Sequence, residues 1–272
     1  MQERQQESTG TPDGEGGRGG MDNADGAERV DYGYQQVSAA EKRRRVGQVF
    51  ASVAPRYDLM NDLMSFGLHR AWKRFAVAIA ALRPGERVLD AAGGTGDLSR
   101  LCLPRVGERG QVVLLDASDA MLRKARERCL DRGIVEGIRY VRGDAERPPF
   151  REESFDCILV AFGMRNLANR EAGLRNMRKG LRRGGRLIAL EFSRPVTATL
   201  RRLHRHYCLR FLPFLGEKVL GDAASYRYLA ESVLVYPEQR RIARDMREAG
   251  YREVEYYNLC GGIVAAHRGY RL

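Results

Sequence analysis

Residues 87–97 read RVLDAAGGTGD. A short apolar run ends at Asp90, and a turn rich in glycine, Gly93 to Gly96, follows before an amphipathic stretch. Glycine permits positive φ and lets the backbone approach a ligand closely, and the first N–H groups of a following helix attract anionic groups. The stretch therefore predicts a strand, a ligand-binding loop and a helix, although an ordinary glycine-rich turn would give the same pattern.

Strands and helices alternate after this loop. Apolar runs predict strands at residues 111–115, 138–141, 157–161 and 187–191, and amphipathic stretches predict helices at 98–106, 118–130, 171–182 and 237–250. The last apolar stretches, 254–259 and 262–267, predict a hairpin. This order implies one doubly wound α/β sheet with a reversed last strand.

Polar residues follow three of the predicted strands. Asp116 falls about 20 residues after the glycine loop, where a doubly wound fold presents a carboxylate to a ribose. Asp144 and Ala145 follow the third strand, where a carboxylate can accept from an adenine amino group and a backbone N–H can donate to a ring nitrogen. Arg165 and Asn166 follow the fourth strand, at the edge where ligands bind in open α/β sheets.

Two segments lie outside this repeating pattern. Residues 50–79 have helix-spaced apolar positions and predict an N-terminal helical cap, on which Tyr57 and Asn61 lie one turn apart. Their alternative role is capping or packing. Residues 194–236 mix leucine, phenylalanine and arginine and predict a helical lid, whose outer face would also suit a lipid-tailed substrate or a membrane surface.

Composition limits the class of protein. The chain has 272 residues and 43% hydrophobic residues, enough for a full core. We expect residues 1–35, which are poor in large apolar side chains, to be a disordered tail before a single domain at 36–272. No run reaches the roughly 18 apolar residues of a spanning helix. We therefore expect a cytoplasmic protein, with peripheral membrane contact or a homodimer open.

Neither the net charge nor the cysteine pattern indicates nucleic-acid binding or a structural metal site. The net charge is +12, but no array of aromatic and basic residues typical of RNA-binding sheets is present. The five cysteines are scattered, odd in number and never spaced as CxxC, which favours a reducing compartment and no structural metal.

Several longer motifs resemble a known family. LDAAGGTGD, PPFREESFD and LRRGGRL are similar to class I S-adenosylmethionine-dependent methyltransferases, and VFASVAPRYDLMNDLMSFGLHRAWK, AFGMRN, LEFSRP, DAASYRYLAES and AHRGYRL resemble the UbiE/COQ5 family. The similarity covers about residues 43–272. It implies a Rossmann-like, seven-stranded, mostly parallel sheet, with S-adenosylmethionine as methyl donor. It also implies C-methylation of polyprenylated benzoquinols or demethylmenaquinols in ubiquinone and menaquinone biosynthesis.

The resemblance and the loop together suggest a cofactor site. The residues that we expect to bind S-adenosylmethionine are Asp90, Gly93, Thr95, Gly96, Asp116, Asp144 and Ala145. One position departs from the family pattern, because Ala161 stands where a hydroxyl residue is frequent. A cofactor contact there would be through the backbone or absent.

The catalytic residues that we expect follow from the chemistry of carbon methylation. Arg165 would stabilise a phenolate, and Tyr57 and Asn61 would position the ring oxygens. Arginine stays protonated and is a poor base, so a water held by Tyr57, or Asp97, would take the proton. His69 and His204 are alternative bases. No step requires a metal.

Two rival functions share some of these features. An NAD(P)-dependent oxidoreductase also has a glycine loop and a ribose-binding acid, but its glycines are normally spaced GxGxxG, wider than Gly93, Gly94 and Gly96. A non-catalytic scaffold of a quinone-biosynthesis complex would use the basic lid to contact the inner face of the membrane or other proteins of the pathway.

Overall fold

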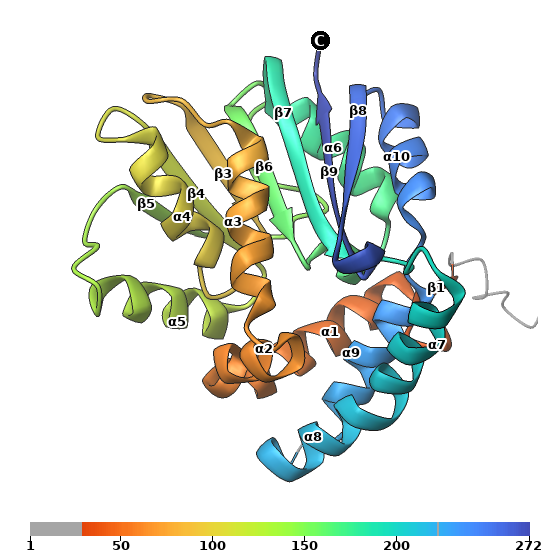
Figure 1. Ribbon diagram of the computed structural model, residues 1–272. Coiled ribbons are helices and arrows are strands. Elements are labelled where there is room, and N and C mark those ends of the chain that lie inside the picture. Colours follow the sequence, from red (N-terminus) through yellow and green to blue (C-terminus); the bar gives the residue numbers. More distant parts are fainter. Residues whose placement is uncertain (1–28, 222) are drawn as a thin grey trace, which may run out of the picture.

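The computed structural model describes residues 29–221 and 223–272, and a seven-stranded sheet forms its centre (Figure 1). Its strands are β3 (Arg87–Ala91), β4 (Gln111–Asp116), β5 (Ile138–Arg142), β6 (Phe155–Ala161), β7 (Leu181–Phe192), β8 (Arg252–Leu259) and β9 (Val264–Tyr270). They lie in the order β5-β4-β3-β6-β7-β9-β8, and β9 runs antiparallel to both neighbours. The predicted doubly wound sheet with a reversed last strand is confirmed.

Helices cover both faces of the sheet. The helices and helical turns are α1 (Ala39–Val53), η1 (Ala54–Arg56), α2 (Tyr57–Ser65), α3 (Leu68–Ala80), α4 (Asp97–Val106), α5 (Asp119–Leu130), η2 (Met164–Asn166), α6 (Arg170–Gly180), α7 (Ala198–His206), η3 (Tyr207–Phe211), α8 (Leu212–Leu220), α9 (Ala223–Val235), α10 (Gln239–Glu248) and η4 (Cys260–Gly262). Val88 packs with α3 and α4, whereas Leu89 packs with α6 and α10. Neighbouring residues of one strand therefore fill two separate cores, as the pleat requires.

A helical layer lies beyond the carboxyl ends of β3 and β6. In Figure 1, this layer contains α1, α2, α7, α8 and α9. Val53 of α1 and Met60 of α2 share a buried cluster with Tyr226 and Leu229 from α9. The segments expected as cap and lid thus pack against each other above the edge of the sheet where ligands bind.

The predicted disordered tail, residues 1–35, extends too far toward the C-terminus. β1 (Arg29–Tyr32) and β2 (Gln35–Ser38) form an antiparallel hairpin, so the prediction of disorder is wrong for residues 29–35. The Tyr32 ring stacks on Tyr228 of α9 at a centroid distance of 4.1 Å. The backbone N of Tyr34 also donates to Glu231 of α9 at 3.2 Å, so contacts with a distant helix hold a segment whose average composition is polar. Residues 1–28 lie outside the described residues.

The start of β7 also differs from the prediction. The strand begins at Leu181 rather than Leu187, so the expected turn at residues 183–186 lies within it. Gly184 has a φ of 78°, and Arg186 is buried, with an ion pair to Glu86 at 2.7 Å. The sequence pattern of arginine and glycine predicts a turn, because it does not show that Arg186 pairs with the distant Glu86.

Candidate active site

Asp90, in β3, supports the glycine loop that follows this strand. This carboxylate is 1% exposed and accepts hydrogen bonds from the backbone N (2.9 Å) and Oγ (2.7 Å) of Ser99 in α4. Burial raises its pKa to about 6. A Cβ on Gly93 would lie 2.8 Å from Cγ of Asp90, so only glycine fits there. Gly96, the N-cap residue of α4, has a φ of 78°. Asp90 therefore shapes the loop.

Asp116 ends β4, next to the loop. Its Oδ2 accepts from the backbone N of Gly94 at 2.8 Å, and its Oδ1 accepts from the backbone N of Ser118 at 2.9 Å. Burial raises its pKa above the ordinary value. Because a carboxylate has about four acceptor sites, each oxygen keeps capacity for a ligand hydroxyl. The backbone thus orients Asp116 as a ribose-binding acid would require.

Asp144 and Ala145 follow β5, the neighbour of β4 in the sheet. Oδ1 of Asp144 accepts from the backbone N of Glu146 at 2.8 Å, and Ala145 is 6% exposed. The ends of β3, β4 and β5 are adjacent. The sheet therefore brings the glycine loop, Asp116 and the Asp144 turn to one edge, as the sequence predicted.

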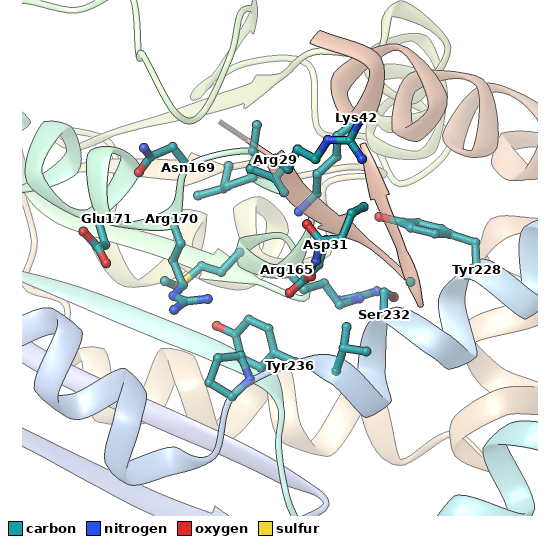
Figure 2. A pocket seen from close by; sticks show the side chains of 18 residues that line it. Arg29, Asp31, Lys42, Arg165, Asn169, Arg170, Glu171, Tyr228, Ser232 and Tyr236 are labelled. Carbon is teal, nitrogen blue, oxygen red and sulfur yellow. Dashed lines mark hydrogen bonds between the residues drawn. The ribbon is translucent and has the colours of Figure 1, made fainter. Parts of the chain in front are cut away.

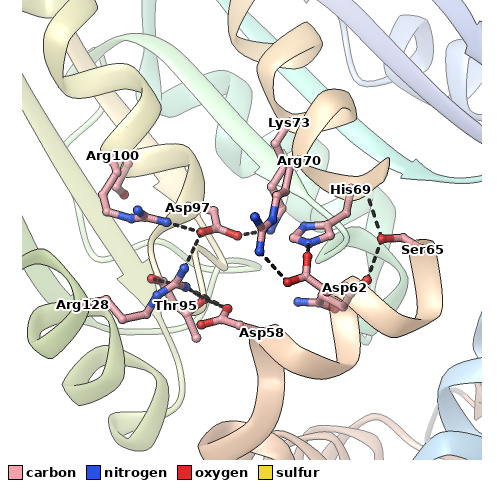
Figure 3. A network of polar contacts seen from close by, with 12 residues as sticks. Asp58, Asp62, Ser65, His69, Arg70, Lys73, Thr95, Asp97, Arg100 and Arg128 are labelled. Atoms are coloured by element: carbon pink, nitrogen blue, oxygen red, sulfur yellow. Dashed lines mark hydrogen bonds and ion pairs between the residues drawn. The ribbon is translucent and has the colours of Figure 1, made fainter. Parts of the chain in front are cut away.

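Thr95 lies in a polar network that links the loop to the cap (Figure 3). Its Oγ1 donates to Oδ1 of Asp58 in α2 at 3.0 Å. Nη1 of Arg128, in α5, donates to Oγ1 of Thr95 at 2.6 Å and to the same Asp58 oxygen at 2.8 Å. Thr95 is 2% exposed. Asp58 and Arg128 could not be identified from sequence patterns, because their partners come from three different elements.

Asp97 does not have the properties of a proton acceptor. It pairs with Lys73 of α3 at 2.7 Å, with Arg128 at 3.0 Å and also with Arg100. Burial alone would raise its pKa, yet these three cations hold the pKa well below the usual range for a carboxyl. The expected alternative of Asp97 as a base is not favoured by this environment, and its side chain instead joins α3, α4 and α5.

The two histidines considered as bases are also engaged in structure. Nε2 of His69 lies 2.8 Å from Oδ1 of Asp62, and burial lowers the pKa of His69. His204 lies in α7 of the lid, with its Nε2 at 3.6 Å from Sγ of Cys208. Burial lowers the pKa of His204 as well. Neither contact involves the turn that carries Arg165.

Arg165 forms a buried ion pair that the sequence did not reveal. Its Nη1 lies 2.7 Å from Oε1 of Glu191 in β7, and the two side chains are 7% and 3% exposed. Burial would lower the pKa of Arg165, but Glu191 raises it above its ordinary value. The guanidinium also lies 5.5 Å from the centre of the Phe192 ring. In the sequence, Glu191 is only the polar last residue of a predicted strand, and nothing there indicates its pairing with Arg165.

Tyr57 and Asn61 lie on α2. Tyr57 is close enough to Arg165 to affect its pKa electrostatically, and its ring centre lies 6.2 Å from that of Phe50. Asn61 comes one turn later on the same helix. A second asparagine, Asn166, accepts from the hydroxyl of Tyr228 at 3.1 Å. Tyr228, from the lid, is a site residue that the sequence did not single out.

Comparisons with known proteins agree with this geometry. Residues 37–271 match the model of the ubiE/COQ5 methyltransferase family. The ubiquinone/menaquinone biosynthesis C-methyltransferase UbiE of Idiomarina loihiensis is 49% identical over 244 residues, which are 90% of this chain and 97% of that protein. The UbiE protein of Azotobacter vinelandii is 49% identical over 238 residues, 88% of this chain and 94% of that protein.

Solved structures share the fold at low sequence identity. A SAM-dependent methyltransferase from Aquifex aeolicus aligns with a TM-score of 0.54 and 17% identity over 74% of this chain and 89% of that one. A SAM-dependent methyltransferase from Thermotoga maritima, described as a possible histamine N-methyltransferase, gives 0.57 and 20% over 83% and 99%. The length of the family match and the high identity of the UbiE relatives decide the assignment. This chain belongs to the ubiE/COQ5 methyltransferase family.

Proposed function

We propose that this protein transfers the methyl group of S-adenosylmethionine to a ring carbon of a polyprenylated quinol, in ubiquinone or menaquinone biosynthesis. The proposal is supported by the family and by the identity to UbiE relatives. The observation that carries it in the structure is the buried Arg165–Glu191 pair, which follows β6, the neighbour in the sheet of the β3 strand that leads into the glycine loop.

The residues around the loop fit S-adenosylmethionine. The backbone of Gly93 to Gly96 and Thr95 would hold the methionine part, and Asp116 would accept from the ribose hydroxyls. Asp144 would accept from the adenine amino group, and the backbone N of Ala145 would donate to the ring. Asp90 would keep the loop in shape. The cofactor supplies an activated methyl on sulfur, so the transfer itself needs no metal.

The protein's part in the reaction is to bring two reactants into line and to favour the ionised quinol. The ring carbon of the phenolate attacks the methyl carbon while the carbon–sulfur bond breaks, and the electron pair stays on sulfur. The proton of the methylated ring carbon then leaves to water. Tyr57, Asn61 and Asn166 would position the ring oxygens, and Arg165 would orient the developing charge.

The outer face of the lid fits a membrane surface. No helix in the described ranges is long and apolar enough to cross a bilayer. However, large apolar side chains are exposed on α7, η3 and α8, namely Leu203 (65%), Phe211 (40%) and Phe214 (55%). Phe66 of the cap is 75% exposed and lies 6.2 Å, centre to centre, from the Tyr207 ring. With the neighbouring arginines, this face would rest on anionic lipid and collect a prenyl-tailed substrate.

The identity of the cofactor that binds distinguishes this proposal from the oxidoreductase alternative. We expect isothermal titration to show saturable binding of S-adenosylmethionine and none of NADH. Transfer of labelled methyl to a reduced demethylmenaquinol and, in parallel, to a reduced 2-methoxy-6-prenyl benzoquinol then separates an enzyme from a scaffold. Binding of the cofactor without labelling of either ring would contradict the proposed function.

A further inference from the structure

A polar cavity of about 280 Å³ lies beside Arg165, under the N-terminal hairpin (Figure 2). Its wall comes from β1, α1, η2, the start of α6 and the end of α9. Met164 and Arg165 line one side, and Tyr228 and Tyr236 line another. This volume is near the lower limit for small-molecule sites. It suits one substituted ring but not a prenyl tail.

Lys42 is the unusual member of this wall. The residue is 6% exposed, and among the described residues no hydrogen bond or ion pair to its ammonium group is present, although Asp31 and Glu146 lie near enough to favour its charged form. Burial lowers its pKa to about 8, with Arg170 acting in the same direction and Asp31 and Glu146 opposing it. A buried charge without an acceptor is costly. The arrangement therefore points to an acceptor that a ligand supplies.

The other charged groups of the wall already have partners. Arg165 pairs with Glu191 at 2.7 Å, and Arg170 pairs with Asp245 at 2.8 Å. Asp31 accepts a hydrogen bond from Gln36, and Glu171 lies 3.9 Å from Arg175. Arg29 also has an interaction of its own. Since the Arg165–Glu191 pair carries no net charge, it stabilises a new anion less than a lone cation would.

A second group in the wall lacks a hydrogen bond. The hydroxyl of Tyr236 is buried without a partner in the part of the chain that the structure describes. Tyr228, on the neighbouring side, uses its hydroxyl to donate to Asn166, which follows Arg165. Polar side chains from α1, η2 and the lid thus surround one space, and two of them lack partners.

We propose that this cavity receives the ring head group of the quinol, and that Lys42 accepts the proton of a ring hydroxyl and then holds the phenolate oxygen. This inference rests on the proposed function. It assigns to Lys42 a role that we had expected of a water or of Asp97, and it leaves to Arg165 the orientation of the ring. Tyr57 and Asn61 do not line this cavity, so this inference replaces the ring-positioning role proposed for them above.

Every proton in this step has a donor and an acceptor. The neutral Lys42 amine takes the hydroxyl proton, which leaves an ammonium beside a phenolate. After the ring carbon has gained the methyl and lost its own proton to water, the phenolate oxygen takes the proton back from Lys42. Each turnover thus releases one proton to solvent, and Lys42 returns to its starting state.

The first test uses a dye that reports ionisation without methyl transfer. 4-Nitrophenol absorbs at longer wavelength when it is ionised. With S-adenosylhomocysteine bound and the pH held near 6, we expect the wild-type protein to bind the dye as phenolate. Lys42→Met should abolish the shift in absorbance, whereas Lys42→Arg, which keeps the charge, should retain it. Lys179→Met, an exposed lysine at the other end of α6, is the control.

The second test uses the pH profile of methyl transfer. In the wild type kcat/KM should rise as the pH passes about 8, because the neutral amine is needed. Both Lys42→Met and Lys42→Arg should lose this rise and fall by about 10²- to 10⁴-fold in kcat, the usual range for a general base. Neither should change the affinity for S-adenosylmethionine, which also shows that the variants fold.

Two outcomes would overturn the inference. One is a Lys42→Met variant that still ionises the bound dye or keeps the wild-type pH profile. The other is a wild-type protein that methylates quinol but leaves the dye unionised. Absence of methyl transfer by the wild type would instead refute the proposed function, so the two failures are distinguishable.

Discussion

Arg128 and Asp58 are 70 positions apart in the chain, yet Nη1 of Arg128 lies 2.8 Å from Oδ1 of Asp58. The same guanidinium contacts the hydroxyl of Thr95 and the carboxylate of Asp97. Arg128 therefore joins the cap helix α2, the glycine loop and α4. The cap and the glycine loop thus share this side chain as a partner, in addition to the direct bond from Thr95 to Asp58.

We predict that Arg128→Met weakens binding of S-adenosylmethionine. Loss of charged hydrogen bonds worth about 1.5–3 kcal/mol should raise the dissociation constant by about one to two powers of ten. Isothermal titration measures this directly. Arg123→Met, on the exposed side of the same helix, should bind as the wild type does. Equal affinities of the two variants would show that Arg128 does not order the loop.

Variants of the Arg165–Glu191 pair should affect stability and activity differently. Arg165→Met leaves the buried Glu191 without its partner, so the free energy of unfolding should fall by about 3–5 kcal/mol. The double variant Arg165→Met/Glu191→Met should recover most of that stability while methyl transfer stays low. Denaturant unfolding and initial rates give the two quantities. A double variant with wild-type activity would remove Arg165 from the mechanism.

Asp90 makes stability depend on pH. Its pKa is raised from 3.8 to about 6 by burial, so its contribution to stability is present below the unfolded-state pKa and is lost as the pH rises through about 6. We expect Asp90→Asn, which keeps an acceptor for Ser99, to gain stability relative to the wild type between pH 4 and 6. The gain should then stay constant, at a few kcal/mol. Urea unfolding at several pH values would reveal the opposite trend if Asp90 were stabilised as an anion.

The exposed face of the lid should govern contact with lipid. Phe211→Glu and Phe214→Glu are expected to reduce sedimentation with vesicles containing phosphatidylglycerol, because a charge replaces an apolar contact. Val135→Glu changes a more exposed apolar residue (75%) after α5 and should have no effect. Transfer to a short-tailed quinol in detergent should continue in all three. If the lid variants still sediment with vesicles, the face does not bind membrane.

Sequence patterns predicted the sheet and the residues at its edge because these depend on local order. Asp116 and Asp144 each end a strand, and parallel strands bring their carboxyl ends to one edge. Contacts between distant segments could not be predicted in this way. The pairing of Arg165 with Glu191, the stacking of Tyr32 on Tyr228 and the burial of Lys42 all depend on how separate elements pack. Lys42 itself lies in a run of four basic residues that reads as a solvated helix face.

Methylation of a ring carbon can be tested by following the methyl group itself. The wild-type protein is incubated with S-adenosylmethionine labelled with ¹³C in the methyl group and with a reduced short-chain demethylmenaquinol or 2-methoxy-6-prenyl benzoquinol. The product is then examined by NMR. We predict a ¹³C signal of a methyl on an aromatic carbon, with one equivalent of S-adenosylhomocysteine formed. A ¹³C-labelled methoxy signal, or no labelled product from either acceptor while the cofactor is bound, would rule out methylation of a ring carbon.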